Sequence, residues 1–298
     1  MMSKLLYAYV AYWTVVAVWT LAKNPRTFAT HVKYNVLTIG AFIMALPFYW
    51  MVITSLKSYG EAQHLPPIWW PEKLQWGNYP EAWNKPVVSF GRYYFVSGST
   101  AIVSTIGVLA TALLAAYAFA KMNFYGKGIF FYIVLATIMV PGEVLLTPNY
   151  IMLSKLGWLD SYKALVVPWL ASVFSIFLMR QFFMTIPDDL WDAAQIDGAG
   201  RWRFLWRVLV PLSKPVLITS GIFSFISSWN SLLWPLIVTS KPEMRTLMVG
   251  LQVFTNEAQG DYHLMMAAAT FCIFPIVVIF FFMQRFFIEG IARSGLKS

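Results

Sequence analysis

The sequence predicts an all-α, polytopic helical membrane protein, and three observations carry this prediction. Of the 298 residues, 59% are hydrophobic and 12% are charged, whereas soluble domains carry about 25% charged residues. Several apolar runs reach the roughly 20 residues that a helix needs to cross about 30 Å of hydrocarbon. Basic residues gather in short segments between these runs, as in proteins whose helices are oriented in a bilayer. The net charge of +9 therefore fits lipid headgroups and topology better than nucleic acid.

The apolar runs define seven expected spans. In chain order they are Leu5–Leu21, Val36–Leu56, Phe95–Ala120, Ile129–Pro148, Tyr162–Phe183, Pro215–Val238 and His263–Phe287. The first run follows a short basic start, which would also fit a cleaved signal peptide or an interfacial segment. Its length and aromatic content favour an additional amino-terminal span. We expect residues 1–35 to form this extra segment and a cytoplasmic link, and residues 36–298 to form the transmembrane domain.

Lysine and arginine counts give the expected orientation. If residues 184–214 are cytoplasmic, the segments on their side of the membrane carry twelve lysines and arginines and the opposite segments carry nine. This bias favours a cytoplasmic position for residues 184–214 and for the carboxyl terminus. The longest opposite segment, residues 57–94, holds four tryptophans and five prolines, which favour the headgroup level and interrupt long helices. We expect a compact cap on the outer face, with a partnerless interfacial belt as the alternative.

Small residues and prolines within the spans indicate how the helices pack and bend. Gly107, Thr111 and Ala115 recur at every fourth position, a spacing that lets helix backbones approach closely in lipid. Five prolines lie within or near spans, and each frees a backbone carbonyl that a neighbouring helix or a cavity must satisfy. They are Pro47, Pro141, Pro168, Pro235 and Pro275. A helical core that moves is the expected consequence.

The sequence lacks the motifs of most catalytic and metal sites. One cysteine, Cys272, excludes an intrachain disulfide, and three scattered histidines make no zinc motif. No glycine-rich loop with Lys-Ser/Thr is present to hold ATP, and no nucleophile elbow or HExxH helix occurs. We therefore expect no metal and no cofactor on this chain. The same absences argue against a membrane-embedded transferase.

Four residues are candidates for a solute path. Glu143 follows Pro-Gly near the fourth span; intramembrane acids are functional candidates, although a span-interrupting turn facing water is the favoured interpretation. Trp229 and Asn230 lie inside the sixth span, where an amide needs a partner and an indole offers a stacking face. Contacts that hold helices together are the alternative for this pair. Asn149, at the outer end of the fourth run, is a candidate for an outer mouth.

Residues 187–211, here named the charged island, form a polar amphipathic segment between two apolar runs. Pro187 and the acids that follow it predict a helix start, with the proline near the first helical position. Ala193, Ala194 and Asp197 follow at helical spacing, and Gly198 permits a chain reversal. A second short helix, which carries three arginines, is expected to end at Pro211. Docking of a helix into a groove of a soluble partner explains this pattern better than a helix lying on lipid headgroups.

The charged island resembles the "EAA" loop in the membrane permease subunits of ABC importers. The resemblance rests on Asp192-Ala193-Ala194, on Gly198, and on Val208 to Pro211 after nine intervening residues. Asp192 departs from the usual glutamate of the family. Further stretches are similar to the second permease subunit of the carbohydrate-uptake branch, and the likeness covers roughly residues 36 to 298. These stretches are Leu114–Ala120, Leu178–Phe183, Trp229-Asn230 with Leu233–Leu236, and Gln284–Gly290.

The resemblance implies six core transmembrane helices and an importer in a bacterial or archaeal plasma membrane. It implies a second, homologous permease subunit, two subunits that bind ATP and Mg²⁺, and a solute-binding protein outside. It also implies that the island docks in a cleft of the ATPase, with seven residues of the island as the expected coupling residues. These are Asp192, Ala193, Ala194, Asp197, Gly198, Arg201 and Pro211. The solute would be a sugar, oligosaccharide, polyol or glycerol phosphate. The rival function is a carrier or channel that works without ATP.

Overall fold

The computed structural model describes residues 25–85, 89–257 and 260–295, and the regular structure within these ranges is helical throughout. The expected span Leu5–Leu21 lies outside the described residues. Three described helices are long and apolar enough to cross a bilayer, namely Thr30–Ser55, Phe90–Lys121 and Tyr262–Gln284. They belong to helices α2 (Pro25–Ser55), α5 (Phe90–Lys121) and α16 (Tyr262–Gly295). The prediction of an all-α membrane protein is confirmed.

The other expected spans are not single straight helices. Three helix pairs are long and apolar enough together, and each pair bends sharply at a short break. The pairs are Lys127–Met139 with Gly142–Lys155 at 92°, Tyr162–Trp169 with Val173–Met184 at 43°, and Arg201–Leu212 with Lys214–Trp229 at 80°. Within the described residues the model therefore offers up to six spans, if each bent pair counts as one.

Three expected continuous spans are wrong, and each is interrupted close to a proline. In Tyr162–Phe183 the helix stops at Trp169, just after Pro168, and resumes at Val173. The run Ile129–Pro148 breaks at Val140, which is extended (φ −83°, ψ 116°) because a residue before proline avoids the helical region. The run Pro215–Val238 breaks after Trp229 and resumes at Leu233. Pro235 has no amide hydrogen to donate to the carbonyl four residues earlier, so a helix cannot run through this stretch undisturbed.

The remaining helices are short. They are α3 (Tyr59–Gln63), α4 (Asn78–Asn84), α6 (Lys127–Ala136), α7 (Leu146–Lys155), α8 (Tyr162–Val166), α9 (Val173–Met184), α10 (Asp189–Ile196), α11 (Arg201–Phe204), α12 (Val210–Leu212), α13 (Lys214–Trp229), α14 (Leu233–Val238) and α15 (Leu247–Glu257). Five further single turns connect them: η1 (Thr137–Met139), η2 (Gly142–Leu145), η3 (Val167–Trp169), η4 (Leu205–Leu209), which is π-helical, and η5 (Pro242–Met244).

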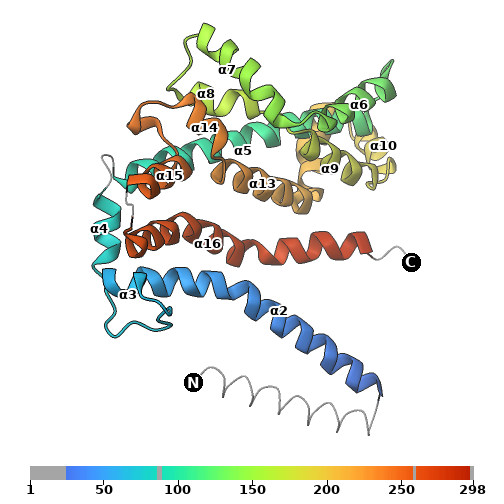
Figure 1. The fold of residues 1–298 in the computed structure, drawn as a ribbon. Helices are drawn as coiled ribbons and strands as arrows, with labels where there is room; N and C mark the ends of the chain where they lie inside the picture. Colours follow the sequence, from blue (N-terminus) through green and yellow to red (C-terminus); the bar gives the residue numbers. More distant parts are fainter. Residues whose placement is uncertain (1–24, 86–88, 258–259, 296–298) are drawn as a thin grey trace.

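Helix α5 is the centre of the bundle. It packs along α9 and α13, and α16 contacts α13 on one side and α2 on the other. Figure 1 shows α2 along α16, on the far side of α16 from α5. The same view places α3 and α4 at one end of the molecule and α10 at the other. One end of the molecule thus carries α3 and α4, and the opposite end carries α10.

Two residues of the small-residue stripe on α5 lie close to the break in a neighbouring span. A β-carbon added at Gly107 would overlap Leu170 Cδ2, and Thr111 Oγ1 donates a hydrogen bond to the Leu170 carbonyl oxygen at 2.6 Å. Leu170 lies in the break between α8 and α9. The predicted close approach is confirmed, and its partner is an interrupted span rather than a continuous helix.

The segment between α2 and α5 is compact. It is shorter than the expected 57–94, because α5 already begins at Phe90. Asn78 Nδ2 donates to the carbonyl oxygens of Ser55 and Lys57, both at 2.8 Å, and Lys85 Nζ lies 2.5 Å from Asp261 Oδ2. These contacts fasten the segment to the adjoining ends of α2 and α16.

Candidate functional site

The charged island folds as a helical hairpin. Helix α10 ends at a tight reversal in which Gly198 has φ +72° and Ala199 N donates to the Ala194 carbonyl oxygen at 2.8 Å. A β-branched residue would be strained at this positive φ. Two details of the expected boundaries are corrected. Pro187 precedes the N-cap Asp188 instead of occupying the first helical position, and Pro211 lies inside α12, so the second helix ends at Leu212.

One face of the hairpin is buried in the bundle. Ala194, Phe204, Leu205 and Leu209 belong to a hydrophobic cluster with residues of α5 and α9. Phe204 is 1% exposed, and its ring meets Trp191 edge to face at 5.0 Å between centroids. These buried side chains anchor the hairpin to the bundle. A movement of the hairpin must therefore displace the residues of α5 and α9 that contact it.

The other face of the hairpin is open, and it carries most of the predicted contact residues. Asp192, Ala193, Asp197, Gly198, Arg201 and Pro211 are exposed, whereas Ala194 is buried and packs inward. Large apolar side chains of the hairpin are exposed as well; Ile196 is 88% exposed, Trp202 65% and Trp206 54%. Exposed apolar groups among charges are typical of surfaces that bind other proteins. Sequence reasoning did not single out Ile196, although it follows Asp192 by one helical turn.

Polar contacts join the hairpin to the end of α5. Lys121 Nζ lies 2.6 Å from Asp188 Oδ1 and 2.6 Å from the Ile186 carbonyl oxygen. Tyr117 Oη donates to the Arg201 carbonyl oxygen at 3.2 Å. Both helices of the hairpin are therefore tied to the same helix of the core.

A cavity of about 790 Å³ lies deeper in the bundle, where the interrupted spans meet. Its lining includes Gly142 and Glu143 at the break between α6 and α7, and Ala171 and Ser172 at the break between α8 and α9. It also includes residues 230–232, between α13 and α14. Broken helices are tolerated at membrane depth where they line a cavity, so these breaks and the cavity are parts of one structure.

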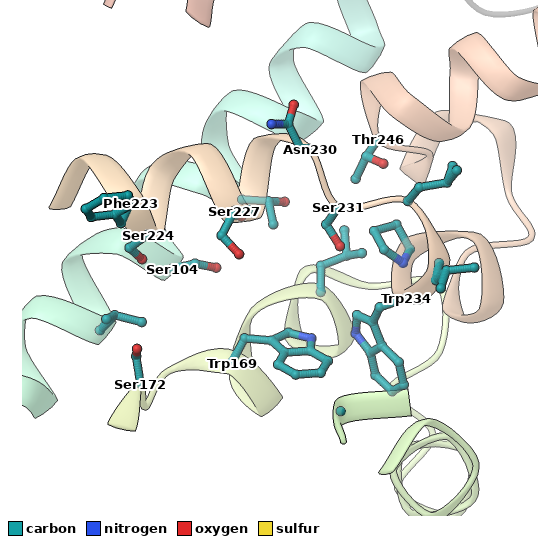
Figure 2. Close-up of a pocket in the computed structure, with 18 of the residues that line it drawn as sticks. Ser104, Trp169, Ser172, Phe223, Ser224, Ser227, Asn230, Ser231, Trp234 and Thr246 are labelled. Atoms are coloured by element: carbon teal, nitrogen blue, oxygen red, sulfur yellow. The ribbon is translucent and has the colours of Figure 1, made fainter. Parts of the chain in front are cut away.

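Hydroxyl groups and aromatic rings dominate the lining, and we name this the serine-rich cavity. Its hydroxyl side chains are Thr100, Ser104, Ser172, Ser175, Ser224, Ser227, Ser228, Ser231 and Thr246. Figure 2 shows Ser227 and Ser231 on one side of the open space and the indoles of Trp169 and Trp234 on the other. The two indoles meet edge to face at 5.7 Å between centroids. Such a surface offers hydrogen bonds and an apolar wall at once.

The structure places the four predicted path residues differently. Glu143 and Asn230 line the cavity, although the amide of Asn230 points away from the tryptophan rings in Figure 2. Trp229 does not line it, which agrees with the alternative that its contacts hold helices together and not with a stacking face for solute. Its side chain is 3% exposed, and Nε1 donates to the Cys272 carbonyl oxygen at 3.1 Å, so it holds α13 against α16. Asn149, on α7, is not among the lining residues either.

A pattern in the sequence could have revealed the cavity. Ser224, Ser227, Ser228 and Ser231 follow the spacing i, i+3, i+4 and i+7, which is a polar stripe along one face of a helix. A polar stripe in an apolar run indicates a face turned away from lipid. No comparable sequence pattern predicts that Trp169 lines the cavity. Its position there depends on the break between α8 and α9, which the sequence pattern does not show.

Two helices connect the charged island with the serine-rich cavity. Helix α9 has Ser172 and Ser175 of the cavity at its amino-terminal end and enters the island after Met184. Helix α13 leaves the island through Ser213, and Ser227, Ser228 and residue 230 of its carboxyl-terminal end line the cavity. The surface of the island and the cavity wall are thus opposite ends of the same two helices.

Comparisons with known proteins identify the family to which the chain belongs. Residues 107–293 match the family described as binding-protein-dependent transport system inner membrane component. The chain is 34% identical over 264 residues to the sn-glycerol-3-phosphate transport system permease protein UgpE of Yersinia pestis bv. Antiqua (strain Antiqua), covering 87% of this chain and 94% of the relative. The UgpE protein of Agrobacterium fabrum (strain C58 / ATCC 33970) is 34% identical over 276 residues, covering 90% and 98%.

A solved structure shares the fold. It is the crystal structure of a bacterial ABC transporter involved in the import of the acidic polysaccharide alginate. One of its chains superposes with a TM-score of 0.78 at 22% identity, covering 89% of this chain and 98% of that chain. The chain therefore belongs to the family of binding-protein-dependent transport system inner membrane components, and it is a multi-pass permease subunit of an ABC importer.

Proposed function

We propose that this subunit moves a sugar or related solute inward by alternating access, driven by ATP hydrolysis in partner subunits that dock on the charged island. The observation that carries the proposal is the double connection through α9 and α13, each of which runs from the island to the serine-rich cavity. When the partner moves the island, both α9 and α13 are displaced, and the distance between the two cavity walls changes. A partner shifts such an equilibrium only if its affinity differs between the two states.

The docking surface consists of the open face of the hairpin. Asp192, Ala193 and Asp197 lie on its first helix, Gly198 forms the turn, and Arg201 begins the second helix. Exposed Ile196 and Trp202 supply apolar area that association would remove from water, which is the main favourable term in most protein associations. The buried opposite face supports force transmission, because the hairpin cannot tilt without moving Phe204 and Leu205 in the core.

The assembly that we propose has a second permease subunit, two ATP-binding subunits and an external solute-binding protein. ATP and Mg²⁺ belong to the ATP-binding subunits, and this chain binds no cofactor of its own. Residues 184–214 and the carboxyl terminus face the cytoplasm, and the α3–α4 cap faces outward, which fits its place at the other end of the molecule (Figure 1). The lysine and arginine bias of the loops supports the same orientation.

The solute class follows from the relatives and from the cavity. The two relatives are permease proteins for sn-glycerol-3-phosphate, and the serine-rich cavity presents hydroxyl groups and indole rings. Both indicate a small polyhydroxylated solute: a sugar, oligosaccharide, polyol or glycerol phosphate. Glu143 and Asn230 are the path residues of the sequence that line this cavity.

The experiment compares two substitutions at one turn. Gly198→Val should abolish the coupling of ATP hydrolysis to uptake in proteoliposomes that contain the whole importer. Nothing lies within 4 Å of a β-carbon at this position, so the effect would come from the backbone conformation and not from a clash. Gly198→Asn is the matched control, because asparagine tolerates positive φ, and it should retain most coupling. Full coupling in Gly198→Val would refute the docking role, and uptake by this chain alone without ATP would establish the rival carrier.

A further inference from the structure

We propose that Arg180 and Lys127 bind the phosphate group of an anionic phospholipid where α5 ends and α6 begins. Such a site goes beyond the proposed function, because lipid binding needs neither ATP coupling nor a solute path. Arg180 lies on α9, within the expected span Tyr162–Phe183. An ionisable side chain inside a span is a candidate functional group, and the charged island and the serine-rich cavity leave this one unused.

The guanidinium of Arg180 lies between three helices. Its Nε, on α9, donates to the Phe119 carbonyl oxygen in the last turn of α5 at 3.2 Å, and its Cζ lies 4.0 Å from the ring centre of Phe131 on α6. The residue is half-buried, and the described residues give it no carboxylate within 4.0 Å. A guanidinium has further N–H donors in a planar fork that matches the oxygens of a phosphate, so Arg180 is equipped to bind one.

Two lysines bring more positive charge to the same place. Lys127 Nζ donates to the Met122 carbonyl oxygen at 2.9 Å, close to the end of α5 that Arg180 also binds. The charged side chains that act most strongly on this ammonium group are Arg180, Asp188 and Lys121. Asp188 is the one carboxylate among them; it is paired with Lys121, and its side chain is 82% exposed. In the described part of the chain, Arg180 and Lys127 thus have no carboxylate of their own.

Helix capping explains only part of this arrangement. Cations near the last carbonyl groups of a helix accept its orphan oxygens as partners and offset its dipole, and Arg180 and Lys127 do this for α5. Capping accounts for the donors that the carbonyl oxygens occupy. It does not account for the remaining donors of the guanidinium or for the excess of positive charge, both of which an anion would satisfy.

The surroundings identify this anion as a lipid headgroup. Lys121 is the last residue of one apolar span and Lys127 is the first residue of the next, so both lie at the boundary of the bilayer. Exposed aromatic residues mark the same level, since Tyr125 is 100% exposed and Phe130 is 55% exposed. Figure 1 shows α6 at the same end of the molecule as α9 and α10. Acyl chains can lie along the exposed apolar side chains of α6 while the phosphate reaches Arg180.

The first experiment measures which lipid lies against this site. The complete importer is placed in phosphatidylcholine nanodiscs that contain a small share of photoreactive phosphatidylglycerol or, separately, of photoreactive phosphatidylcholine. Mass spectrometry then quantifies the cross-links on peptides that cover residues 122–135. Phosphatidylglycerol should label these peptides at least about three-fold more than phosphatidylcholine. Equal labelling would mean that another group, such as a carboxylate of a partner subunit, neutralises the site, and it would overturn the proposal without any substitution.

The second experiment assigns the preference to particular side chains. The double variant Arg180→Gln/Lys127→Gln should bring the labelling ratio close to one. Arg180→Lys keeps the charge but loses the planar fork, so it should retain part of the preference. Lys214→Gln removes an exposed cation at the start of α13 and is the matched control, which should leave the ratio unchanged. An undiminished ratio in the double variant would contradict the role of these two residues.

The third experiment separates a lipid phosphate from a free one. Unlabelled phosphatidylglycerol should compete with the photoreactive lipid, whereas inorganic phosphate at matched ionic strength should not. Competition by inorganic phosphate would show that the site takes a soluble anion and would contradict the assignment to lipid. None of these measurements uses ATP, so a failure of the proposed function would appear separately, as uptake that needs no ATP.

Discussion

Lys121 Nζ lies 2.6 Å from Asp188 Oδ1 and 2.6 Å from the Ile186 carbonyl oxygen, and so joins the last turn of α5 to the start of the charged island. The two contacts differ in their surroundings. The side chain of Lys121 is 8% exposed, whereas that of Asp188 is 82% exposed. Solvent therefore screens the ion pair, and the hydrogen bond to the carbonyl oxygen carries more of the connection.

This difference predicts unequal effects of two substitutions. Asp188→Asn removes an exposed ion pair and should change the free energy of unfolding by less than about 1 kcal/mol. Lys121→Met leaves the carbonyl oxygen of Ile186 without its donor and should cost about 1–3 kcal/mol, with weaker coupling of ATP hydrolysis to uptake. Thermal unfolding and coupled uptake of the purified importer measure both quantities. A larger effect of Asp188→Asn would show that the ion pair is the main connection.

The close approach of Gly107 to Leu170 predicts a steric effect. Gly107→Ala adds a methyl group where Leu170 Cδ2 lies, so the Leu170 side chain must move to another position, at a cost of about 1 kcal/mol. Gly98→Ala is the control on the same helix, because nothing lies within 4 Å of its β-carbon, and it should be neutral or stabilising. The double variant Gly107→Ala/Leu170→Ala should recover part of the loss in a thermal unfolding assay. No difference between the two glycine variants would refute the packing argument.

Two tryptophans should differ in what they affect. Trp229→Phe removes the hydrogen bond to Cys272 and should lower stability by about 1 kcal/mol, with the KM for solute uptake unchanged. Trp169→Phe alters the cavity wall and should change that KM several-fold with a smaller effect on stability. Uptake kinetics measure the KM of both variants, and thermal unfolding measures their stability. The reverse assignment of effects would return Trp229 to the solute path.

The α3–α4 cap should respond to acid through Glu61. Its carboxylate accepts hydrogen bonds from the amides of Glu72 and Ser58, both at 2.9 Å, and these bonds lower its pKa below the ordinary value. A lowered pKa means that the stabilisation is complete above the unfolded-state pKa of about 4.3 and is lost as the pH falls through the folded-state pKa. Hydrogen exchange of peptides spanning residues 58–72 should therefore accelerate in acid beyond its intrinsic pH dependence. In Glu61→Gln this extra acceleration should be absent; if it persists, another group is responsible.

Much of the fold could be predicted from hydropathy, because the thickness of the bilayer sets the minimum length of a helix that spans it. The expected span Phe95–Ala120 corresponds to α5, Phe90–Lys121, and His263–Phe287 lies within α16, whereas α2 begins at Pro25, eleven residues before the expected Val36. One break was predicted, as a span-interrupting turn at Glu143, whereas the other two were not, since an apolar average does not register where the backbone stops being helical. Pro168 and Pro235 lie close to the other two breaks and were interpreted only as kinks.

The charged island could be predicted from the sequence, whereas the serine-rich cavity could not. The charged island is a local motif whose turn needs a glycine, so Gly198 and its neighbours could be located from sequence spacing. The serine-rich cavity joins residues from distant spans, and Trp169 and Ser227 meet there only after α5, α8 and α13 have packed. The sequence left a solute-facing and a helix-holding role open for Trp229, because a buried indole bonded to a backbone carbonyl and a solute-facing indole have the same sequence signature.

The central claim is that the charged island moves the walls of the serine-rich cavity through α9 and α13. Spin labels at Ser172→Cys and Ser227→Cys, on opposite walls (Figure 2), report this movement as a distance distribution measured by electron–electron double resonance in the complete importer. We predict that the distribution shifts between the nucleotide-free state and the state trapped with ATP and vanadate, and that Gly198→Val abolishes the shift. A distance that is the same in both states, or a shift that survives Gly198→Val, would contradict the claim.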